Sequence, residues 1–345
     1  MTARFDQGAW AESGVQTVQP GVHRVPLPLP NDGLHAVNVY LLEGLAEDGR
    51  LVMIDGGWAI PEARKKLEEA LAVIGRDLSD IGHILVTHVH RDHYTQAVEL
   101  RRLLGARVCL GAGERRGLEL LNEMRGGLGS ALRTLRRAGA EELAELVQVT
   151  YPDLYEPGHW EAPDRWLGAE TLRFGPHALR VIPTPGHTRG HVVFLDERRR
   201  LMFSGDHVLP RITPSIGFEA SDPGGRPLAS YLESLRLMTD YADTRLLPAH
   251  GPVGESTHTR VAELVAHHDD RLARTLAVVG DDTRDAFSVA RGLVWTRREL
   301  AFGALSPLNQ MLAVNETVAH LDVLALRGRV AVSSVGGVNR YTRMR

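Results

Sequence analysis

Residues 85–97, LVTHVHRDHYTQA, place three histidines and an aspartate within six positions: His88, His90, Asp92 and His93. The stretch continues a short apolar run that is typical of a buried strand. Imidazole nitrogens and carboxylate oxygens are good ligands for zinc and neighbouring divalent metals. Four such groups directly after a strand can begin two metal sites but cannot complete them. We therefore expect further histidines or acids at the ends of later strands.

Three later segments repeat this arrangement of an apolar strand followed by a metal-ligand residue. His187 lies in VIPTPGHTRGHVVF, Asp206 in LMFSGDHVLP and His250 in RLLPAHGP. A single loop histidine is usually only an exposed polar residue. Three such loops, in order after the first motif, indicate a common metal site at one edge of a sheet.

With these motifs the sequence resembles the metallo-β-lactamase-fold hydrolases over roughly residues 20–255. Five family motifs occur in order: VMIDGG with Asp55, THVHRDH, TPGHTRGH, FSGDH and LPAHG. The resemblance implies a mixed α/β (α+β) fold, a four-layer αββα sandwich with the metals at one edge. The domain limits that it implies are 1–255 for the catalytic domain, with a helical and loop-like insertion at 112–170.

The resemblance also implies the roles of the ligand residues. Carried over position by position, the first metal ion would be bound by His88, His90 and His187. The second would be bound by Asp92, His93 and His250, and Asp206 would bridge the two ions. The ions would be zinc, with iron or manganese as alternatives.

Four acidic or imidazole groups would support these ions. Asp92 and Asp206 would assist proton transfer. Asp55 would orient a ligand histidine from behind. His191 would do the same, although it begins a strand and packing is its alternative role.

A bridging hydroxide explains what such a site can do. Two metals roughly 3.5–4 Å apart can share a hydroxide because they lower the pKa of bound water to about 7. The leading prediction is hydrolysis of an ester, thioester or lactone of a small acyl substrate. The alternatives are an endoribonuclease or phosphodiesterase, and a non-catalytic metal- or DNA-binding regulatory protein. A persulfide dioxygenase on a single iron also stays open, whereas His90 disfavours a flavodiiron reductase, which usually has a glutamate there.

The substrate contacts are expected around the motifs and in the insertion, whose aromatic residues either bind an acyl group or only pack. The candidates are Tyr94, Tyr155, Trp160, His207 and Arg211. Tyr94 stands where the family often has glycine. It either faces the pocket or packs behind it.

The tail, residues 256–345, alternates helical stretches with a closing β-hairpin and therefore predicts a winged-helix-like domain. Its stretch ETVAHLDVLALRGRV resembles the subgroup that includes lactamase-like protein 2. The tail carries 12 arginines against 9 acidic residues, a net charge of +3. This excess is weak for a nucleic-acid surface, so a nucleic-acid partner is disfavoured but stays open.

Composition excludes few other classes. The 345 residues are 43% hydrophobic, carry a formal charge of −3 and include one cysteine, Cys109, which lies in a strand-like run. No apolar run reaches membrane-spanning length, and the first residues carry no signal-peptide pattern, which also disfavours a secreted β-lactamase. We expect a cytoplasmic, soluble protein with a small-molecule acyl substrate and no membrane partner. A homodimer is compatible with these features.

Overall fold

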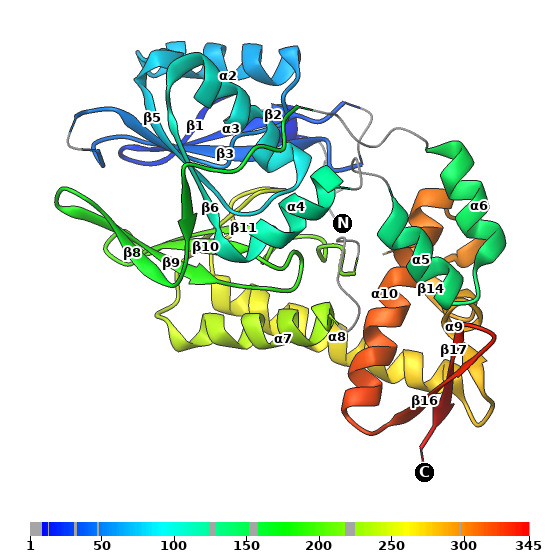
Figure 1. The fold of residues 1–345 in the computed structure, drawn as a ribbon. Coiled ribbons are helices and arrows are strands. Elements are labelled where there is room, and N and C mark those ends of the chain that lie inside the picture. Colours follow the sequence, from blue (N-terminus) through cyan, green and yellow to red (C-terminus); the bar gives the residue numbers. More distant parts are fainter. Residues whose placement is uncertain are drawn as a thin grey trace.

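Two β-sheets lie face to face at the centre of the molecule, and helices cover both outer faces (Figure 1). The computed structural model describes residues 9–12, 14–30, 33–46, 48–123, 128–151, 158–217, 225–296 and 298–344. The layers are helix, sheet, sheet and helix, as the family resemblance implies. Among the described residues, no helix combines the length and the apolar character that crossing a membrane requires.

The first sheet contains seven strands in chain order, of which β1 to β4 are antiparallel and β4 to β7 parallel. The strands are β1 (Gln16–Gln19), β2 (Val22–Pro28), β3 (Ala36–Leu42), β4 (Leu51–Ile54), β5 (Ile81–Val86), β6 (Arg107–Gly111) and β7 (Arg165–Leu167). Helices α2 (Pro61–Val73) and α3 (Arg91–Leu104) make two of the three crossovers of the parallel part. Both lie on the outer face of this sheet (Figure 1). A short helix, α1 (Ala9–Glu12), precedes the sheet.

The second sheet has the order β12-β11-β10-β9-β8. Its strands are β8 (Glu170–Phe174), β9 (His177–Pro183), β10 (Val192–Asp196), β11 (Leu201–Gly205) and β12 (Arg245–Pro248). Helix α7 (Pro227–Leu237) and the first part of α8 (Thr257–Val279) cover its outer face (Figure 1). Between the sheets the side chains form a closed core, in which the rings of Tyr40 and Phe203 meet edge to face at 5.3 Å.

The insertion predicted at 112–170 turns away from the sandwich after its first helix. It contains α4 (Arg115–Glu123), α5 (Gly129–Arg137) and α6 (Glu141–Thr150), and then returns to the first sheet as β7. Helices α5 and α6 pack against α10 (Pro307–Leu326) of the tail. Buried residues of the insertion, such as Leu135 and Val147, share one hydrophobic cluster with the tail. Two segments far apart in the sequence therefore lie side by side.

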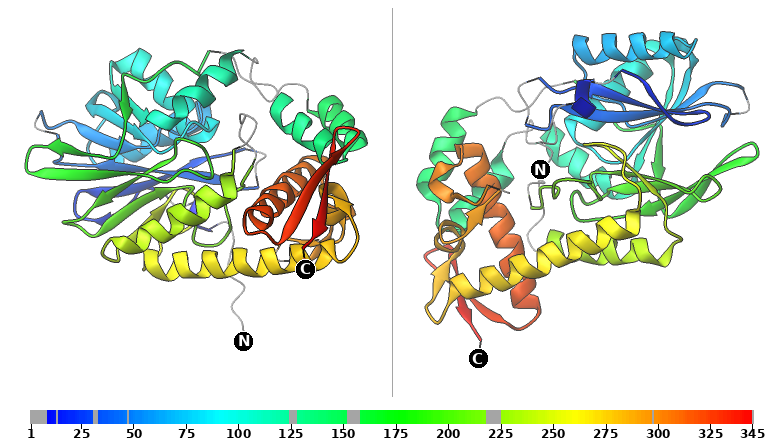
Figure 2. Two further views of the ribbon diagram at one scale, coloured as in Figure 1. Left: turned by 60° about the horizontal axis from the view of Figure 1, so that its bottom comes forward. Right: turned by 180° about the vertical axis from the view of Figure 1, so that it is seen from behind.

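The tail joins the sandwich through α8, which runs from beneath the second sheet to the C-terminal elements (Figure 2). It contacts α7 on one side and α10 on the other. The remaining elements are β13 (Arg284–Asp285), α9 (Ala286–Arg291), β14 (Val294–Trp295), β15 (Leu300–Ala301), α10, β16 (Val330–Val335) and β17 (Val338–Arg343). The closing hairpin pairs with β13 in the order β13-β17-β16. The helices and the hairpin lie where the sequence predicts them; the winged-helix likeness and the domain boundary at 256 stay predictions.

Candidate metal centre

Four loops deliver the seven predicted ligands to one edge of the sandwich. The THVHRDH motif runs from the end of β5 into the first turn of α3, and the β9–β10 loop carries His187. Asp206 directly follows β11, and His250 lies just after β12. The structure brings all seven side chains into two neighbouring groups, in each of which the candidate ligand atoms lie within 4.8 Å of one another.

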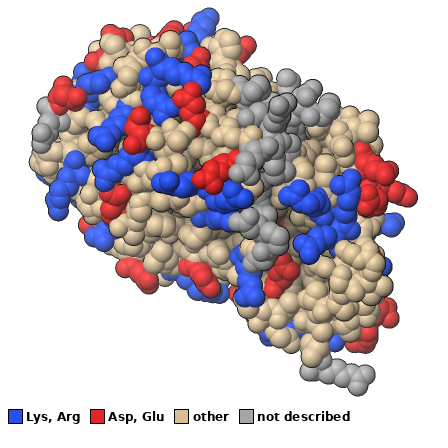
Figure 3. Space-filling view, viewed as in Figure 1, with Lys and Arg blue, Asp and Glu red and all other residues tan. Residues whose placement is uncertain are grey.

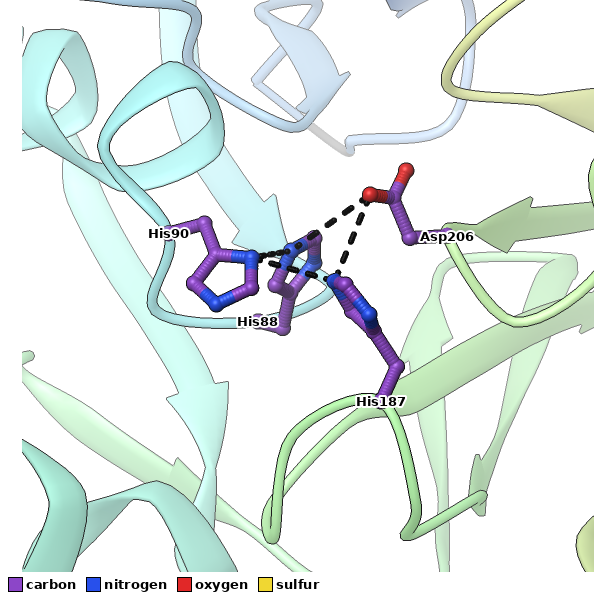
Figure 4. Close-up of side chains that lie close together, drawn as sticks. All are labelled: His88, His90, His187 and Asp206. Atoms are coloured by element: carbon purple, nitrogen blue, oxygen red, sulfur yellow. Dashed lines mark hydrogen bonds and ion pairs between the residues drawn. The ribbon is translucent and has the colours of Figure 1, made fainter. Parts of the chain in front are cut away.

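The first group consists of His88, His90, His187 and Asp206 (Figure 4). The Nδ1 atom of His90 lies 3.0 Å from the Nε2 atom of His88 and 3.0 Å from the Nε2 atom of His187. The Oδ2 atom of Asp206 lies 3.3 Å from the Nε2 atom of His187 and 4.0 Å from that of His88. Three ring nitrogens and one carboxylate oxygen thus converge on a single point.

The second group consists of Asp92, His93 and His250. The Oδ2 atom of Asp92 lies 3.5 Å from the Nε2 atom of His93 and 3.4 Å from that of His250. The other oxygen of Asp206, Oδ1, faces this group at 3.7 Å and 3.3 Å from the same two nitrogens. The carboxylate of Asp206 therefore lies between the groups and turns one oxygen toward each.

For His187 and His250, a hydrogen bond behind the ring fixes which nitrogen carries the proton. The Nδ1 atom of His187 lies 2.8 Å from the carbonyl oxygen of Ser215, and that of His250 lies 2.8 Å from the carbonyl oxygen of Ala36. A carbonyl only accepts, so both rings donate through Nδ1. Their Nε2 atoms then carry a free lone pair, which is the form that binds a metal.

Asp55 performs the same task for ligands of both groups. Its carboxylate accepts hydrogen bonds from the backbone amide and hydroxyl of Thr87, at 2.7 and 2.9 Å, and from Nδ1 of His93 at 3.0 Å. Because the Thr87 hydroxyl donates to Asp55, it is free to accept from Nδ1 of His88 at 3.1 Å. Asp55 itself has a positive φ of 59°, which turns the chain sharply after β4.

His191 is fully buried and supports Asp206 through its backbone. Its Nε2 atom accepts a hydrogen bond from the backbone amide of Asp206 at 3.2 Å, and its Nδ1 atom donates to the hydroxyl of Thr184 at 2.8 Å. Gly205, just before Asp206, has a φ of +50°, and a Cβ there would lie 2.7 Å from the side chain of Thr87. Only glycine fits this close approach of β11 to the THVHRDH loop.

The donor set fits a divalent cation. Three buried atoms that face the second group have no hydrogen-bond partner in the described part of the chain: Nε2 of His93, Nε2 of His250 and Oδ1 of Asp206. Buried polar atoms are nearly always paired, so this concentration indicates an ion. Burial alone would lower the pKa of His93, but the carboxylates of Asp92, Asp55 and Asp206 raise that pKa to about 10. The surrounding negative charge thus favours a cation at this place.

Residues 32–250 match the sequence family described as the metallo-beta-lactamase superfamily. The chain belongs to this superfamily. It is a metallo-β-lactamase-fold hydrolase whose His and Asp residues are positioned to bind metal.

Similar proteins cover most of the chain. It is 26% identical over 317 residues to the probable metallo-hydrolase YqjP of Bacillus subtilis, covering 87% of this chain and 90% of that protein. It is 25% identical over 325 residues to an atrochrysone carboxyl ACP thioesterase of Aspergillus fumigatus, covering 90% of this chain and 62% of that one. A metallo-beta-lactamase family protein from Thermus thermophilus is similar in structure, with a TM-score of 0.76, 30% identity, and coverage of 94% and 99%.

Two of the predicted substrate contacts lie in the core of this metallo-β-lactamase-fold chain. Tyr94 is fully buried and donates its hydroxyl hydrogen bond to the carbonyl of Glu161, so it takes the packing role that the sequence left open. Trp160 is 8% exposed and belongs to the hydrophobic cluster beneath α3, and its carbonyl accepts a hydrogen bond from Asn122 at 2.9 Å. The observed burial supports packing for both aromatic residues.

The other three candidates differ in position. His207 is fully buried beside Asp206, its carbonyl accepts the hydroxyl of Tyr231 at 2.9 Å, and burial lowers the pKa of its ring to about 3. Arg211 is half-buried in the loop that follows. Tyr155 lies outside the described residues. Contact with substrate stays a prediction for Arg211, whereas the burial of His207 indicates a structural role.

Sequence reasoning missed the residues that hold the His250 loop. The side-chain amide of Asn38 donates to the carbonyls of Pro248 and Gly251 at 2.9 and 2.8 Å, and the hydroxyl of Tyr40 donates to that of Pro248 at 2.8 Å. Both side chains come from β3 and are buried. Asparagine inside the apolar stretch AVNVYLL was the available signal, since a buried amide needs partners.

Proposed function

We propose that this hydrolase cleaves an acyl thioester, ester or lactone with the help of two divalent metal ions, zinc first, with iron or manganese as alternatives. The observation that carries the dinuclear part is the position of Asp206 between two groups of ligand atoms. His88, His90 and His187 would hold one ion. Asp92, His93 and His250 would hold the other, and each oxygen of Asp206 would face one of them.

When bound, the ions supply Lewis acidity and bring the pKa of water to about 7, so that it can attack at neutral pH. The protein supplies the orientation. His187, His250 and His93 donate hydrogen bonds to the carbonyls of Ser215 and Ala36 and to the carboxylate of Asp55, and each ring is thereby held in one tautomer. The burial of these rings excludes other water. No ligand needs to reorganise before the reaction, which lowers its barrier.

Asp92 is the group best placed to move a proton. Its side chain is 14% exposed, compared with 9% for Asp206 and 3% for Asp55. A proton taken from the attacking water can therefore pass through Asp92 to the leaving group or to solvent. Asp206, turned with one oxygen to each group, would act chiefly as a bridge.

Two observations support a carbonyl substrate over a nucleic acid. A relative that aligns with 90% of this chain is named an ACP thioesterase, and a thioester is a carbonyl substrate. A polyanion needs a continuous basic surface beside the metals. On the face of the sandwich that Figure 3 shows, Lys and Arg are interspersed with Asp and Glu. The guanidinium of Arg91, next to Asp92, lies over the ring of Trp58 at 4.3 Å.

The test is a substrate panel with one metal-loaded preparation. We expect turnover of a thioester, an aryl ester or a lactone, little or no cleavage of single-stranded RNA, and near-complete loss of turnover in His88→Ala. His83→Ala is the matched control, because His83 lies on the same strand, β5, away from the ligands. RNA cleavage that depends on His88, with no carbonyl substrate hydrolysed, would establish the phosphodiesterase alternative. Metal binding without turnover of any substrate would favour the alternative of a non-catalytic regulatory protein.

A further inference from the structure

A cavity of about 970 Å³ lies outside the metal centre, between α5, α10, β17 and the start of α7. None of the seven metal ligands lines it. Its volume is in the range of small-molecule sites. Its polar lining includes Arg133, Arg137, Arg226, Asn315 and Asp322.

Among the described residues, arginines outnumber acids around the cavity. Four arginines and one acid, Asp322, line it. Arg136 pairs with Glu141 at 2.9 Å, whereas no ion pair of the described residues uses Arg133, Arg137 or Arg226. Arg133 and Arg137 are one turn apart on α5 and exposed. Figure 3 shows a group of Lys and Arg side chains over this helix. The charge of Arg226 already acts on the partly buried carboxyl of Asp322. Arg133 and Arg137, which form no ion pair with the described residues, favour an anionic ligand such as a phosphate.

Asn315 adds a second, independent observation. This residue is 2% exposed and lines the cavity, and neither its Oδ1 nor its Nδ2 atom has a hydrogen-bond partner among the described residues. A buried amide without partners is costly unless a ligand completes it. Because an asparagine offers one acceptor and one donor group, its natural complement is another amide.

The cavity shares two segments with the metal centre. Gly217 forms part of its wall and packs against Asn315, and Ser215, two residues earlier, accepts the hydrogen bond of His187. Two extended residues span at most about 7 Å. Helix α7 begins at the cavity wall, and its Tyr231 bonds to the carbonyl of His207, next to Asp206. The two sites therefore lie close together at these segments.

We propose that this cavity binds the phosphate-bearing pantetheine arm of an acyl thioester substrate. The phosphate would contact Arg133, Arg137 and Arg226, and an amide of the arm would pair with Asn315. The thioester at the end of the arm would reach the metal centre. The inference rests on the proposed function and specifies its substrate class. The arm can come from coenzyme A or from a carrier protein, since both contain the same phosphopantetheine group.

Kinetics with matched thioesters test the assignment. One acyl group is presented on coenzyme A, on a carrier protein, on pantetheine without phosphate, and on N-acetylcysteamine. We expect kcat/KM to be at least about tenfold higher for the phosphate-bearing substrates, and Arg133→Ala with Arg137→Ala to remove roughly that factor, chiefly through KM. Hydrolysis of the N-acetylcysteamine thioester should not change.

The control is Arg198→Ala. Arg198 is exposed, and it lies in the β10–β11 turn at the opposite end of these strands from Asp206. It should leave every substrate unaffected. A preference for the carrier protein over coenzyme A, or the reverse, identifies the source of the arm, and either result supports the cavity assignment.

Direct binding separates this inference from the proposed function. S-methyl coenzyme A, a thioether that cannot be hydrolysed, is titrated by calorimetry into the metal-loaded protein and the double variant. If the protein binds the thioether through these arginines but cleaves no thioester, the assignment of the cavity is supported and the proposed hydrolysis is overturned. Thioester turnover without any phosphate preference would support the function and overturn the cavity. Single-stranded RNA that binds through Arg133 and Arg137 and displaces the thioether would overturn the pantetheine assignment.

Discussion

Asp55→Asn tests whether the network behind the histidines sets their metal affinity. The carboxylate of Asp55 accepts three hydrogen bonds, two from Thr87 and one from Nδ1 of His93. Asparagine has almost the same shape, but one of its two positions is a donor. Whichever way the amide turns, it places a donor against the amide of Thr87 or against Nδ1 of His93. The ring of His93 can avoid this only by moving its proton to Nε2, the atom that faces the metal.

The expected magnitude follows from these contacts. Loss of the group that orients a metal ligand typically costs 10–100-fold in metal affinity. That range corresponds to about 1.4–2.8 kcal/mol. The loss should fall on the ion held by Asp92, His93 and His250. The other ion should lose less affinity, because His88 depends on Asp55 only through the hydroxyl of Thr87 and the hydrogen bond of His187 to Ser215 is untouched. The fold should lose about 1–3 kcal/mol, the usual penalty for a buried donor without an acceptor.

The assay is a competition titration of metal-free protein against a chromophoric chelator, together with elemental analysis and urea unfolding. Asp243→Asn is the matched control. Asp243 accepts backbone hydrogen bonds from Thr244 and His258 at the start of α8, away from the ligands, so this variant should lose stability without losing metal. If Asp55→Asn bound two ions with the affinity of the wild type, the orienting role of Asp55 would be refuted.

Three further expectations concern single residues. Asp206→Asn should retain the fold by circular dichroism but lose one metal ion or most of its turnover, because one of the two bridging oxygens is replaced by a donor; two ions with unchanged turnover would disprove bridging. Trp160→Ala should lower the free energy of unfolding by roughly 3–5 kcal/mol, as for other buried aromatic residues. A changed KM with unchanged stability would instead restore its predicted contact with substrate. Burial, together with His320, His267 and Arg271, lowers the pKa of His268 to about 3 from 6.5, so only the unfolded chain takes up this proton as the pH falls below about 6.5. The wild type should therefore lose more stability than His268→Gln between about pH 6.5 and 4 in urea unfolding, and equal losses would contradict the shift.

The sequence could bring the seven candidate ligands together because each lies within a few residues of the end of a strand. Strand ends meet at one edge of a sheet, so residues that each lie near the end of a different strand come close together in the folded chain. Strand β2 was not predicted, since Pro26 and Pro28 interrupt its pattern and proline is unusual inside a sheet. Tyr94 could not be assigned either. Which face of α3 is buried depends on the packing of the sheet and of Glu161, which is far away in the sequence.

The arginine-lined cavity could not be predicted from the sequence, because it also depends on contacts between distant segments. Its walls come from the insertion, from the loop at Gly217, from the start of α7 and from α10, and only the folded chain brings these segments together. The arginines of α5 have the helical spacing of any solvated surface. Asn315 lies in a largely apolar helix, where an isolated amide gives no indication of what it faces. Residues that act through long-range packing leave no local pattern to find.

The two sites should nevertheless be separable by mutation. The metal centre is held by bonds within the sandwich, such as those of Asp55, whereas the charged wall of the cavity comes from α5 and the start of α7, and no residue belongs to both. Mutations at sites without shared partners usually add within about 0.3–0.5 kcal/mol. Asp55→Asn should therefore lower metal affinity and kcat, Arg137→Ala should raise KM for a coenzyme A thioester, and the double variant should show the product of the two effects on kcat/KM. A coupling free energy well above that range, measured in a double-mutant cycle, would mean that binding of the pantetheine arm helps to assemble the metal centre. The segment from Ser215 to Gly217 is the route by which such coupling would travel, because it touches His187 at one end and Asn315 at the other.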